Sequence, residues 1–260
     1  MVSMNNRRPA DPAAAADGSA DMAGPGDHHG AAHPPAASRN LRVYLEQAPD
    51  HGSTTDVVTD ALREAILEGA LPESTWLRED ELARDLGVSR TPVRDALRRL
   101  SDEHLAERTA HRGTVVAPMR LDDVLAAYTA REVLEGAAAR LVALQPPAGT
   151  IEDLRHIHGE MADAFANEDF PVLPKLNLEF HAVLREGSDN PYLRRFLLQI
   201  EHTVRRVSAR TSGFTSRAAA SLDEHGAIVD AIVSGDGALA AEAAQLHIRN
   251  AREARIRRLT

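Results

Sequence analysis

The 260-residue chain contains no cysteine. This absence excludes a disulfide-bonded scaffold, a thiolate metal site and a cysteine nucleophile, and it is compatible with a reducing cytoplasm. Aromatic residues make up only 3% of the chain, which argues against the base-stacking surfaces of single-strand nucleic-acid binders. No apolar run approaches the roughly 20 residues that span a bilayer. We therefore expect a cytoplasmic protein.

The charge of the chain is acidic overall but unevenly distributed. A formal net charge of −9 argues against a nucleic-acid contact that involves the whole surface. Residues 88–99, however, hold four arginines and one aspartate, a local charge of +3. We therefore expect a focal nucleic-acid contact, with duplex DNA as the better-matched partner.

The N-terminal region has the composition of a disordered segment. The first 40 residues hold eleven alanines, five prolines and four glycines, without an aromatic residue, leucine or isoleucine. Such a segment buries too little apolar surface to offset the entropy lost on ordering. We expect residues 1–52 to form a disordered tail and a linker, the linker beginning near residue 41. The remaining length predicts two domains, at 53–119 and 120–260.

A helix-turn-helix is predicted between residues 78 and 100. Two leucines four residues apart share one face of the first helix, and Gly87 follows where a left-handed turn needs a residue without a Cβ. Ser89 or Thr91 can cap the second helix, and Pro92 is tolerated in its first turn. Helical spacing predicts a buried stripe formed by Val93, Ala96, Leu97 and Leu100.

The start of the second helix is predicted to read DNA. A recognition helix enters the major groove with its N-terminal residues facing the base edges. Those residues are Ser89, Arg90, Thr91, Pro92 and Arg94. An arginine there can bind both O6 and N7 of a guanine, while the helix N-terminus favours a phosphate. The alternative interpretation is a solvated helix hairpin whose arginines pair with Asp85 and Asp95.

A β-hairpin is predicted after the second helix. Residues 105–109 and 113–117 have strand composition and are joined by a polar turn that contains Arg112. Such a wing would bring Arg112 to the sugar-phosphate backbone or the minor groove. Upstream, apolar residues at helical spacing between 57 and 66 predict a helix that completes a small core. Together these elements predict a winged-helix domain.

Residues 56–117 resemble the winged-helix domain of the GntR family of bacterial transcription regulators. The match consists of L-A-R-D-L-G-V-S-R-T-P-V-R-D-A-L at 82–97 and R-G-T-V at 112–115. The chain departs from the family at Asp80, where some members have a DNA-contacting arginine, so Asp80 is not a predicted contact. The resemblance implies operator contacts by Ser89, Arg90, Thr91, Arg94, Arg112 and Gly113.

From residue 121 onward the pattern becomes purely helical. Six periodic stretches are separated by short breaks of glycine, proline, asparagine or aspartate. The sequence therefore predicts a mostly α protein, with a winged helix-turn-helix followed by an all-α six-helix bundle. The predicted helices are 122–143, 151–167, 171–186, 191–213, 217–234 and 237–256.

Histidine spacing in the bundle suggests a metal site. His225 and His247 each lie eleven residues from Asp236, so in an antiparallel hairpin both would stand at one height, roughly 16 Å from the turn. Asn177 and His181, four residues apart, share one face of another predicted helix. Three histidines and an oxygen donor suit zinc, nickel or manganese. A histidine on an apolar helix face is also an ordinary core residue, and spacing alone leaves both interpretations open.

Residues 121–256 resemble the helical effector domain called FCD, found in the FadR branch of the GntR family. The similarity lies in N-L-E-F-H at 177–181, E-H-G-A-I at 224–228 and a late histidine in the final helix. The resemblance implies a metal held by Asn177, His181, His225 and His247, although the family usually has aspartate in place of the asparagine. It also implies that arginines hold a small carboxylate effector. The candidates are Arg131 and Arg205.

These expectations together describe a homodimeric, ligand-responsive transcription regulator that represses by occupying operator DNA and is not an enzyme. One alternative is a helical-bundle metalloenzyme, against which the Glu-His spacing departs from the Glu-x-x-His pairs of di-metal bundles. Another is a DNA-binding dimer whose helical domain is purely structural and whose histidines are core residues. The metal content of the purified protein separates that alternative from the metal-binding regulator.

Overall fold

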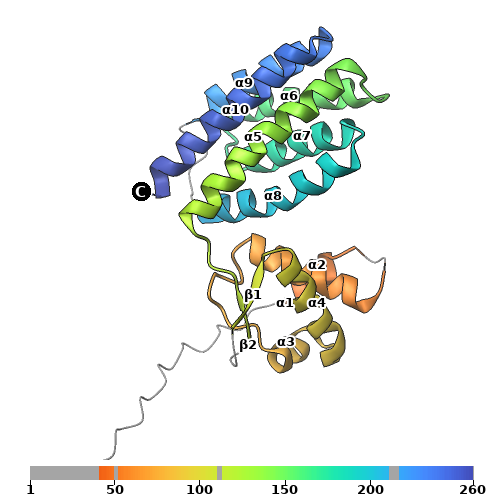
Figure 1. Cartoon of the computed structure of the whole chain (residues 1–260), viewed down its shortest axis with the longest axis vertical. Coiled ribbons are helices and arrows are strands. Elements are labelled where there is room, and N and C mark those ends of the chain that lie inside the picture. The colour runs from red at the N-terminus through yellow and green to blue at the C-terminus, as the bar shows by residue number, and fades with distance from the viewer. Residues whose placement is uncertain (1–40, 50–51, 110–112, 211–216, 260) are drawn as a thin grey trace, which may run out of the picture. The chain divides into compact units, whose positions relative to one another are not determined.

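The computed structural model describes residues 41–49, 52–109, 113–210 and 217–259. The tail predicted at residues 1–40 lies outside this described part. The first half of the described chain forms a winged helix, and the second half is helical (Figure 1). The elements of the winged helix are α1 (Leu41–Gln47), α2 (Thr54–Leu67), α3 (Glu79–Leu86), α4 (Arg90–Asp102), β1 (Ala106–Thr109) and β2 (Gly113–Val116).

Helix α2 begins with a reciprocal cap. The Ser53 hydroxyl accepts a hydrogen bond from the backbone N–H of Asp56, and the Asp56 carboxylate accepts one from the backbone N–H of Ser53 at 2.6 Å. These two bonds satisfy N–H groups that would otherwise lack partners at a helix start. The apolar face of α2 is thereby fixed against α1 and α4 in the core of the winged helix.

The turn between α3 and α4 has the predicted geometry. Gly87 ends α3 with φ 72°, in the left-handed region that costs a residue with a Cβ more than glycine. Ser89 is the extended residue that precedes α4, but its side chain makes no capping hydrogen bond. The predicted stripe is buried, and each of its valine and leucine side chains contributes about 1.5–3 kcal/mol. It comprises Val93, Ala96, Leu97 and Leu100.

Helix α1 lies in the segment that we expected to be a linker. Its first residue, Leu41, is only 2% exposed and belongs to the core of the winged helix. A seven-residue helix has too few turns to show apolar periodicity, so tertiary burial rather than local pattern determines it. The winged-helix core therefore begins at residue 41, earlier than the predicted boundary at 53.

The wing is a two-stranded antiparallel sheet, as predicted. Its register pairs Ala106 with Val116 and Thr109 with Gly113. Gly113 has φ 107°, a conformation that favours glycine at the point where the second strand begins. Val116 is fully buried and attaches the sheet to the core formed by α2 and α4. Arg112, predicted at the tip of the wing, lies outside the described residues.

The second half of the described chain contains the six predicted helices. Figure 1 shows them lying side by side, and α5 contacts α7, α8, α9 and α10. No helix in the described ranges is long and apolar enough to cross a membrane. The helices are α5 (Leu121–Leu144), α6 (Thr150–Ala166), α7 (Leu173–Gly187), α8 (Pro191–Arg210), α9 (Ala218–Val233) and α10 (Gly237–Leu259).

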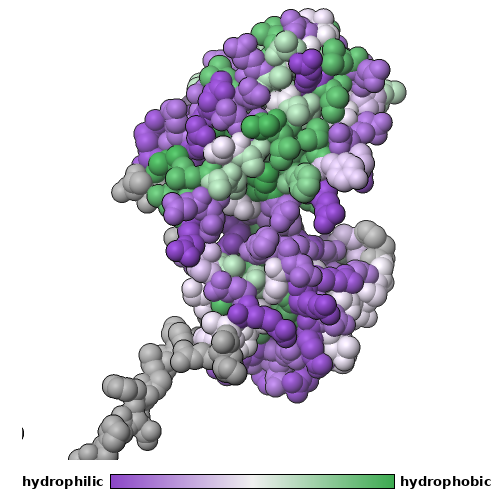
Figure 2. Space-filling view, in the orientation of Figure 1, coloured by the Kyte–Doolittle hydropathy of each residue, from purple (hydrophilic) through white to green (hydrophobic). Residues whose placement is uncertain are grey.

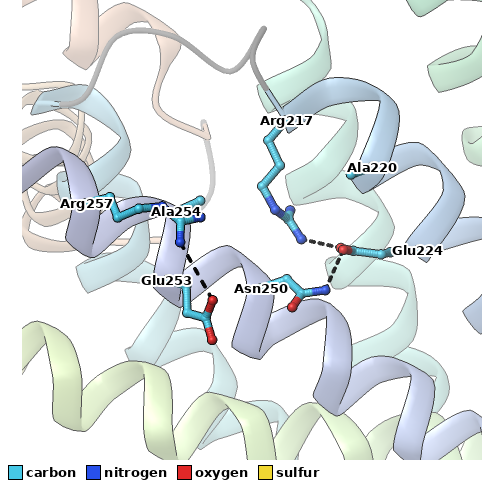
Figure 3. A pocket seen from close by; sticks show the side chains of 7 residues that line it. All are labelled: Arg217, Ala220, Glu224, Asn250, Glu253, Ala254 and Arg257. Carbon is cyan, nitrogen blue, oxygen red and sulfur yellow. Dashed lines mark hydrogen bonds and ion pairs between the residues drawn. The ribbon is translucent and has the colours of Figure 1, made fainter.

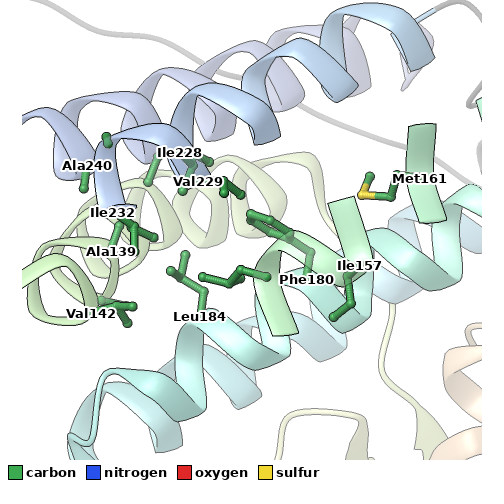
Figure 4. Packing of buried hydrophobic residues seen from close by; sticks show 14 of the residues in the cluster. Ala139, Val142, Ile157, Met161, Phe180, Leu184, Ile228, Val229, Ile232 and Ala240 are labelled. Atoms are coloured by element: carbon green, nitrogen blue, oxygen red, sulfur yellow. The ribbon is translucent and has the colours of Figure 1, made fainter. Parts of the chain in front are cut away.

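The core of the bundle is apolar and draws on nearly all of its helices. Phe180 and Leu184 of α7 pack among Ile228 and Ile232 of α9 (Figure 4), and all four side chains are at most 1% exposed. The helical periodicity that predicted these faces is therefore explained by burial. His181 follows Phe180 directly on α7, and together with His225 and His247 it forms a buried polar group in the bundle.

Candidate functional site

Three buried histidines from three different helices converge inside the bundle. His181 of α7, His225 of α9 and His247 of α10 are 4%, 0% and 2% exposed. Each offers one ring nitrogen, and these nitrogens all lie within 4.8 Å of one another. The Nε2 atoms of His181 and His247 are 3.2 Å apart. The structure thus brings together the three histidines that the sequence pattern selected.

The hairpin of α9 and α10 explains how two of these histidines meet. Gly235 turns the chain with φ 73°, and the two helices then run back along each other. The ring centroids of His225 and His247 lie 4.3 Å apart. Phe180 covers the other side of His225, with ring centroids 4.5 Å apart, and excludes water from it. The equal spacing from the turn therefore places the two imidazoles in contact.

Two carboxylates face the outer nitrogens of the cluster. His247 Nδ1 lies 2.8 Å from Glu224 Oε2, and His181 Nδ1 lies 3.1 Å from Glu135 Oε1. A carboxylate accepts hydrogen bonds, so the contact with Glu224 places the proton of His247 on Nδ1, and the carboxylate of Glu135 favours the same tautomer for His181. In these tautomers the two Nε2 atoms, 3.2 Å apart, each offer a lone pair that a cation can bind.

The cluster holds its histidines in the neutral form. Burial lowers the pKa of His181, and burial together with the charges of the other two imidazoles lowers the pKa of His225 well below 6.5. Burial lowers the pKa of His247 to about 4, against the opposing hydrogen bond of Glu224. Burial alone would raise the pKa of Glu135, but the neighbouring His181 ring and the Arg131 guanidinium lower it to about 2. Neutral imidazole is the form that binds metals.

The donor set fits a divalent metal ion. Two nitrogens bound tetrahedrally to zinc at about 2.0–2.1 Å lie about 3.3 Å apart, close to the observed Nε2 separation. Both nitrogens of His225 are buried, and neither makes a hydrogen bond of good geometry to the described residues. An unpaired buried polar atom costs about 1–3 kcal/mol, so a cation at this point would satisfy atoms that the protein leaves unsatisfied.

The other predicted ligands of the bundle have different environments. Asn177 lies one turn before His181 on α7 and is partly buried, so it stays a predicted fourth ligand. Arg131 of α5 is 6% exposed and donates from Nε to Glu135 Oε1 at 3.0 Å, which links it to His181. Arg205 instead donates to Glu64 of α2 at 3.0 Å. Both arginines are thus ion-paired, and an effector-binding role for either stays a prediction.

A pocket of about 370 Å³ opens beside the cluster (Figure 3). Glu224 lies in its wall and accepts hydrogen bonds from Arg217 and from Asn250 Nδ2, the latter at 2.7 Å. The same carboxylate contacts His247, so Glu224 connects the pocket with the histidine cluster. Its lining comprises Arg217, Ala220, Glu224, Asn250, Glu253, Ala254 and Arg257.

The predicted DNA-reading residues form an exposed surface at the start of α4. The side chains of Arg90 and Arg94 are 60% and 56% exposed, and both contact carboxylates of α3. Arg90 Nε lies 2.9 Å from Asp80, and Arg94 Nε lies 3.3 Å from Glu79. Ser89, Thr91 and Gly113 are also exposed, and Pro92 is partly buried.

Sequence reasoning missed the two carboxylates that contact the histidine cluster. Glu224 precedes His225, and adjacent helix positions point about 100° apart; its carboxylate therefore contacts the neighbouring helix at His247. Glu135 follows Arg131 by four residues, a spacing that brings side chains together on a helix. That spacing was a usable signal for the Arg131–Glu135 pair, whereas nothing local indicated the contact of Glu135 with His181.

Comparison with known proteins gives two family matches that together cover most of the described chain. The family described as "Bacterial regulatory proteins, gntR family" matches residues 54–116, and the FCD domain matches residues 126–250. Both matches lie within the domain boundaries that the sequence analysis placed at 53–119 and 120–260.

Curated relatives and a solved structure agree with these matches. A Paenarthrobacter nicotinovorans protein named "Probable D-xylose utilization operon transcriptional repressor" is 32% identical over 74% of this chain and 84% of its own length. The galactonate operon transcriptional repressor of Escherichia coli (strain K12) is 30% identical over 73% of this chain and 91% of its own. The structure of E. coli McbR/YncC shares the fold, with a TM-score of 0.69 at 18% identity over 81% of this chain and 100% of that one.

Proposed function

Because the chain belongs to the GntR family of transcriptional regulators and carries an FCD domain, we propose that it is a metal-dependent, carboxylate-responsive repressor. In this proposal it binds operator DNA as a homodimer. The observation that carries the metal dependence is the convergence of one ring nitrogen each from buried His181, His225 and His247 within 4.8 Å. The other parts of the proposal are argued below.

DNA reading is assigned to the start of α4 and to the wing. Arg90 and Arg94 are one helical turn apart and exposed, so both can enter one major groove. Ser89 and Thr91 lie beside them, where backbone N–H groups favour a phosphate. Arg112 and Gly113 extend the contact to the backbone through the wing.

The DNA assignment is tested by substituting the arginines one at a time. Arg90→Ala and Arg94→Ala should each weaken binding to a duplex selected from genomic DNA by about 1–3 kcal/mol, since each removes a guanine contact. Arg112→Ala should weaken binding with less loss of discrimination. Gel shifts in which both α4 variants bind normally would show that the docking is wrong.

The metal site is assigned to the three histidines, with Asn177 as an oxygen donor. A bound divalent ion would supply a positive charge and open coordination positions to an anionic ligand. Glu224 orients His247 by accepting its hydrogen bond, and Glu135 lies 3.1 Å from His181 Nδ1; orientation of this kind typically raises metal affinity. Zinc, nickel and manganese all suit this donor set.

Elemental analysis of the purified protein tests the metal site. We expect close to one divalent ion per chain, and His181→Ala, His225→Ala and His247→Ala should each lose most of it. His156 is the matched control, because it is an exposed histidine of the same bundle at 75% side-chain exposure. Protein without stoichiometric metal, even after supplementation, would favour the alternative in which the bundle is structural.

The effector is assigned to the class of small carboxylates. The buried guanidinium of Arg131 and Nδ1 of His181 both contact the carboxylate of Glu135. An anion at the metal would therefore lie near a second positive charge. One relative is named for a galactonate operon, and galactonate is a sugar carboxylate. The class therefore includes sugar acids as well as simpler mono- and dicarboxylates.

Linkage between effector and DNA tests this assignment. An effector that alters DNA affinity must bind differently to the forms that do and do not fit the operator, typically by about 5- to 150-fold. Organic acids selected by thermal shift should therefore bind with affinities that change by the same factor when operator DNA is added. An acid whose affinity ignores DNA is not the effector.

The homodimer is assigned to the face that carries α5 and α10. Figure 2 shows apolar side chains gathered on the helical half of the described chain. Val133 and Leu144 of α5 are 61% and 55% exposed, and Leu239 and Leu246 of α10 are 50% and 47% exposed. The two helices contact each other, so these side chains belong to neighbouring elements. Isolated exposed leucines are common, but a group of them marks an interface.

Sedimentation of surface variants tests the dimer. Val133→Glu and Leu246→Glu should each shift the protein toward monomer and weaken binding to a two-half-site operator. Val43→Glu, at another exposed apolar residue of α1, should leave the oligomeric state unchanged. A monomeric wild-type protein that covers a single half-site would contradict the dimer.

A further inference from the structure

The DNA-reading arginines are paired with carboxylates from the preceding helix. Asp80 lies 2.9 Å from Arg90 Nε. Glu79 lies 3.3 Å from Arg94 Nε and 3.7 Å from a terminal nitrogen of Arg90. Both acids stand in the first turn of α3, which the turn at Gly87 folds back beside the first turn of α4. Two exposed positive charges thus have two negative charges beside them.

These contacts use the inner edge of each guanidinium. The shortest contact of Arg90 and that of Arg94 both involve Nε, next to the aliphatic chain. A guanine is bound through a fork of two N–H groups, and the two terminal nitrogens form a second fork at the outer end of the side chain. A carboxylate at Nε therefore restrains the guanidinium. The outer end of the guanidinium keeps only the longer contact of 3.7 Å between Arg90 and Glu79, which a base can replace.

The same carboxylates weaken attraction to phosphate. Non-specific DNA binding depends on the number of phosphates that the protein neutralises, and each neutralised phosphate steepens the dependence of log affinity on log salt by about 0.9. An aspartate that is 64% exposed beside Arg90 offsets part of the charge that a phosphate would meet. A guanine contact depends on hydrogen-bond geometry and loses less from this offset.

We infer that Glu79 and Asp80 are specificity-determining residues of the DNA-reading surface. They hold Arg90 and Arg94 in position for guanine and lower the affinity of the same arginines for phosphate. This inference rests on the proposed docking of α4 in the major groove. Asp80 is the more informative of the two, because it makes the shorter contact, 2.9 Å to Arg90 Nε.

The experiment compares two neutralising substitutions on one helix. Asp80→Asn removes the charge beside Arg90 and keeps the size of the side chain. Asp85→Asn is the matched control, because Asp85 is an exposed aspartate of α3 for which no ion pair with Arg90 or Arg94 is described. The full-length variants are titrated over a salt series with two duplexes: one selected from genomic DNA, and one with the same bases in shuffled order.

Asp80→Asn should bind the shuffled duplex about 1.4- to 5-fold more tightly, which corresponds to an exposed ion pair of about 0.2–1 kcal/mol. Its salt dependence on that duplex should steepen by up to about 0.9 per protomer. Affinity for the selected duplex should stay constant or fall, so that the ratio of the two affinities decreases. Asp85→Asn should change both duplexes equally. In an Arg90→Ala background, Asp80→Asn should no longer alter the ratio.

Two results would overturn the inference: an unchanged affinity ratio in Asp80→Asn, or equal changes in Asp80→Asn and Asp85→Asn. The second result would mean that only net charge matters. Failure of the proposed docking has a different signature, namely normal binding of the selected duplex by Arg90→Ala. Circular dichroism of each variant confirms that α3 remains folded, as expected for exposed side chains.

Discussion

Replacing His225 with leucine should change stability differently with and without metal. Both ring nitrogens of His225 are buried and unpaired in the described structure, and the side chain is 0% exposed. Leaving a buried polar group without a partner costs about 1–3 kcal/mol. Leucine has a similar volume and no polar atom, and swaps that conserve volume are tolerated well in cores. Without metal, we therefore expect His225→Leu to be about 1–3 kcal/mol more stable than wild type.

Metal should narrow or reverse this difference. An ion that binds only the folded state at 100 times its dissociation constant stabilises that state by about 2.7 kcal/mol. Wild type should gain this amount, and His225→Leu, with one of the three histidine ligands removed, should gain little. For a protein of this size 1 kcal/mol corresponds to about 2–4 °C in Tm. Wild type should therefore rise by roughly 5–11 °C on addition of metal.

The assay is thermal unfolding followed by circular dichroism, first with a chelator and then with excess zinc. His156→Ala should follow wild type in both conditions, because His156 is an exposed histidine paired only weakly with Glu160 at 3.7 Å. An equal zinc-dependent rise in His225→Leu and wild type would refute the metal assignment. Lower stability of His225→Leu in chelator would refute the argument from unpaired nitrogens.

Three further predictions concern the contacts that support each site. Glu224→Gln should lower metal affinity about 10- to 100-fold in competition with a chromophoric chelator, since its carboxylate orients His247; unchanged affinity would remove Glu224 from that role. Ser53→Ala should lower the free energy of unfolding by about 1 kcal/mol in urea, and Ser53→Asp should retain most of it, because both Ser and Asp can cap α2. Gly87→Ala should cost about 1–2 kcal/mol, because φ 72° disfavours a Cβ, and a neutral result would mean that the turn relaxes.

The fold was largely predictable because its signals are local and repetitive. Apolar residues at helical spacing gave the six bundle helices, and glycine at residue 87 gave the turn before α4. Helix α1 was not predictable in the same way. It is seven residues long, and Leu41 at its start is buried by contacts with residues distant in sequence. Short elements depend on tertiary burial, which a single sequence does not display.

The contact between two of the clustered histidines was predictable, because residues at equal distances from the turn of an antiparallel helical hairpin lie side by side. Equal spacing on either side of a turn brings His225 and His247 level, and the measured contact of their rings follows. The partner of a long side chain is harder to predict from the sequence. Arg205 has enough reach and freedom to select any nearby acid, and it contacts Glu64, 141 residues away in sequence. Its partner depends on how the chain folds back rather than on its place in a helix.

The net charge of the DNA-reading surface also depends on which residues the fold brings together, and this affects how the surface binds DNA. Counted along the sequence, residues 88–99 have a charge of +3. In the structure, Arg90, Arg94 and Arg99 are paired with Asp80, Glu79 and Asp56, all of which lie outside that window. DNA therefore meets at least the first two arginines with a carboxylate already beside each of them. That carboxylate offsets the charge that a lone phosphate would meet and affects a guanine fork less, so the surface should favour sequence over charge.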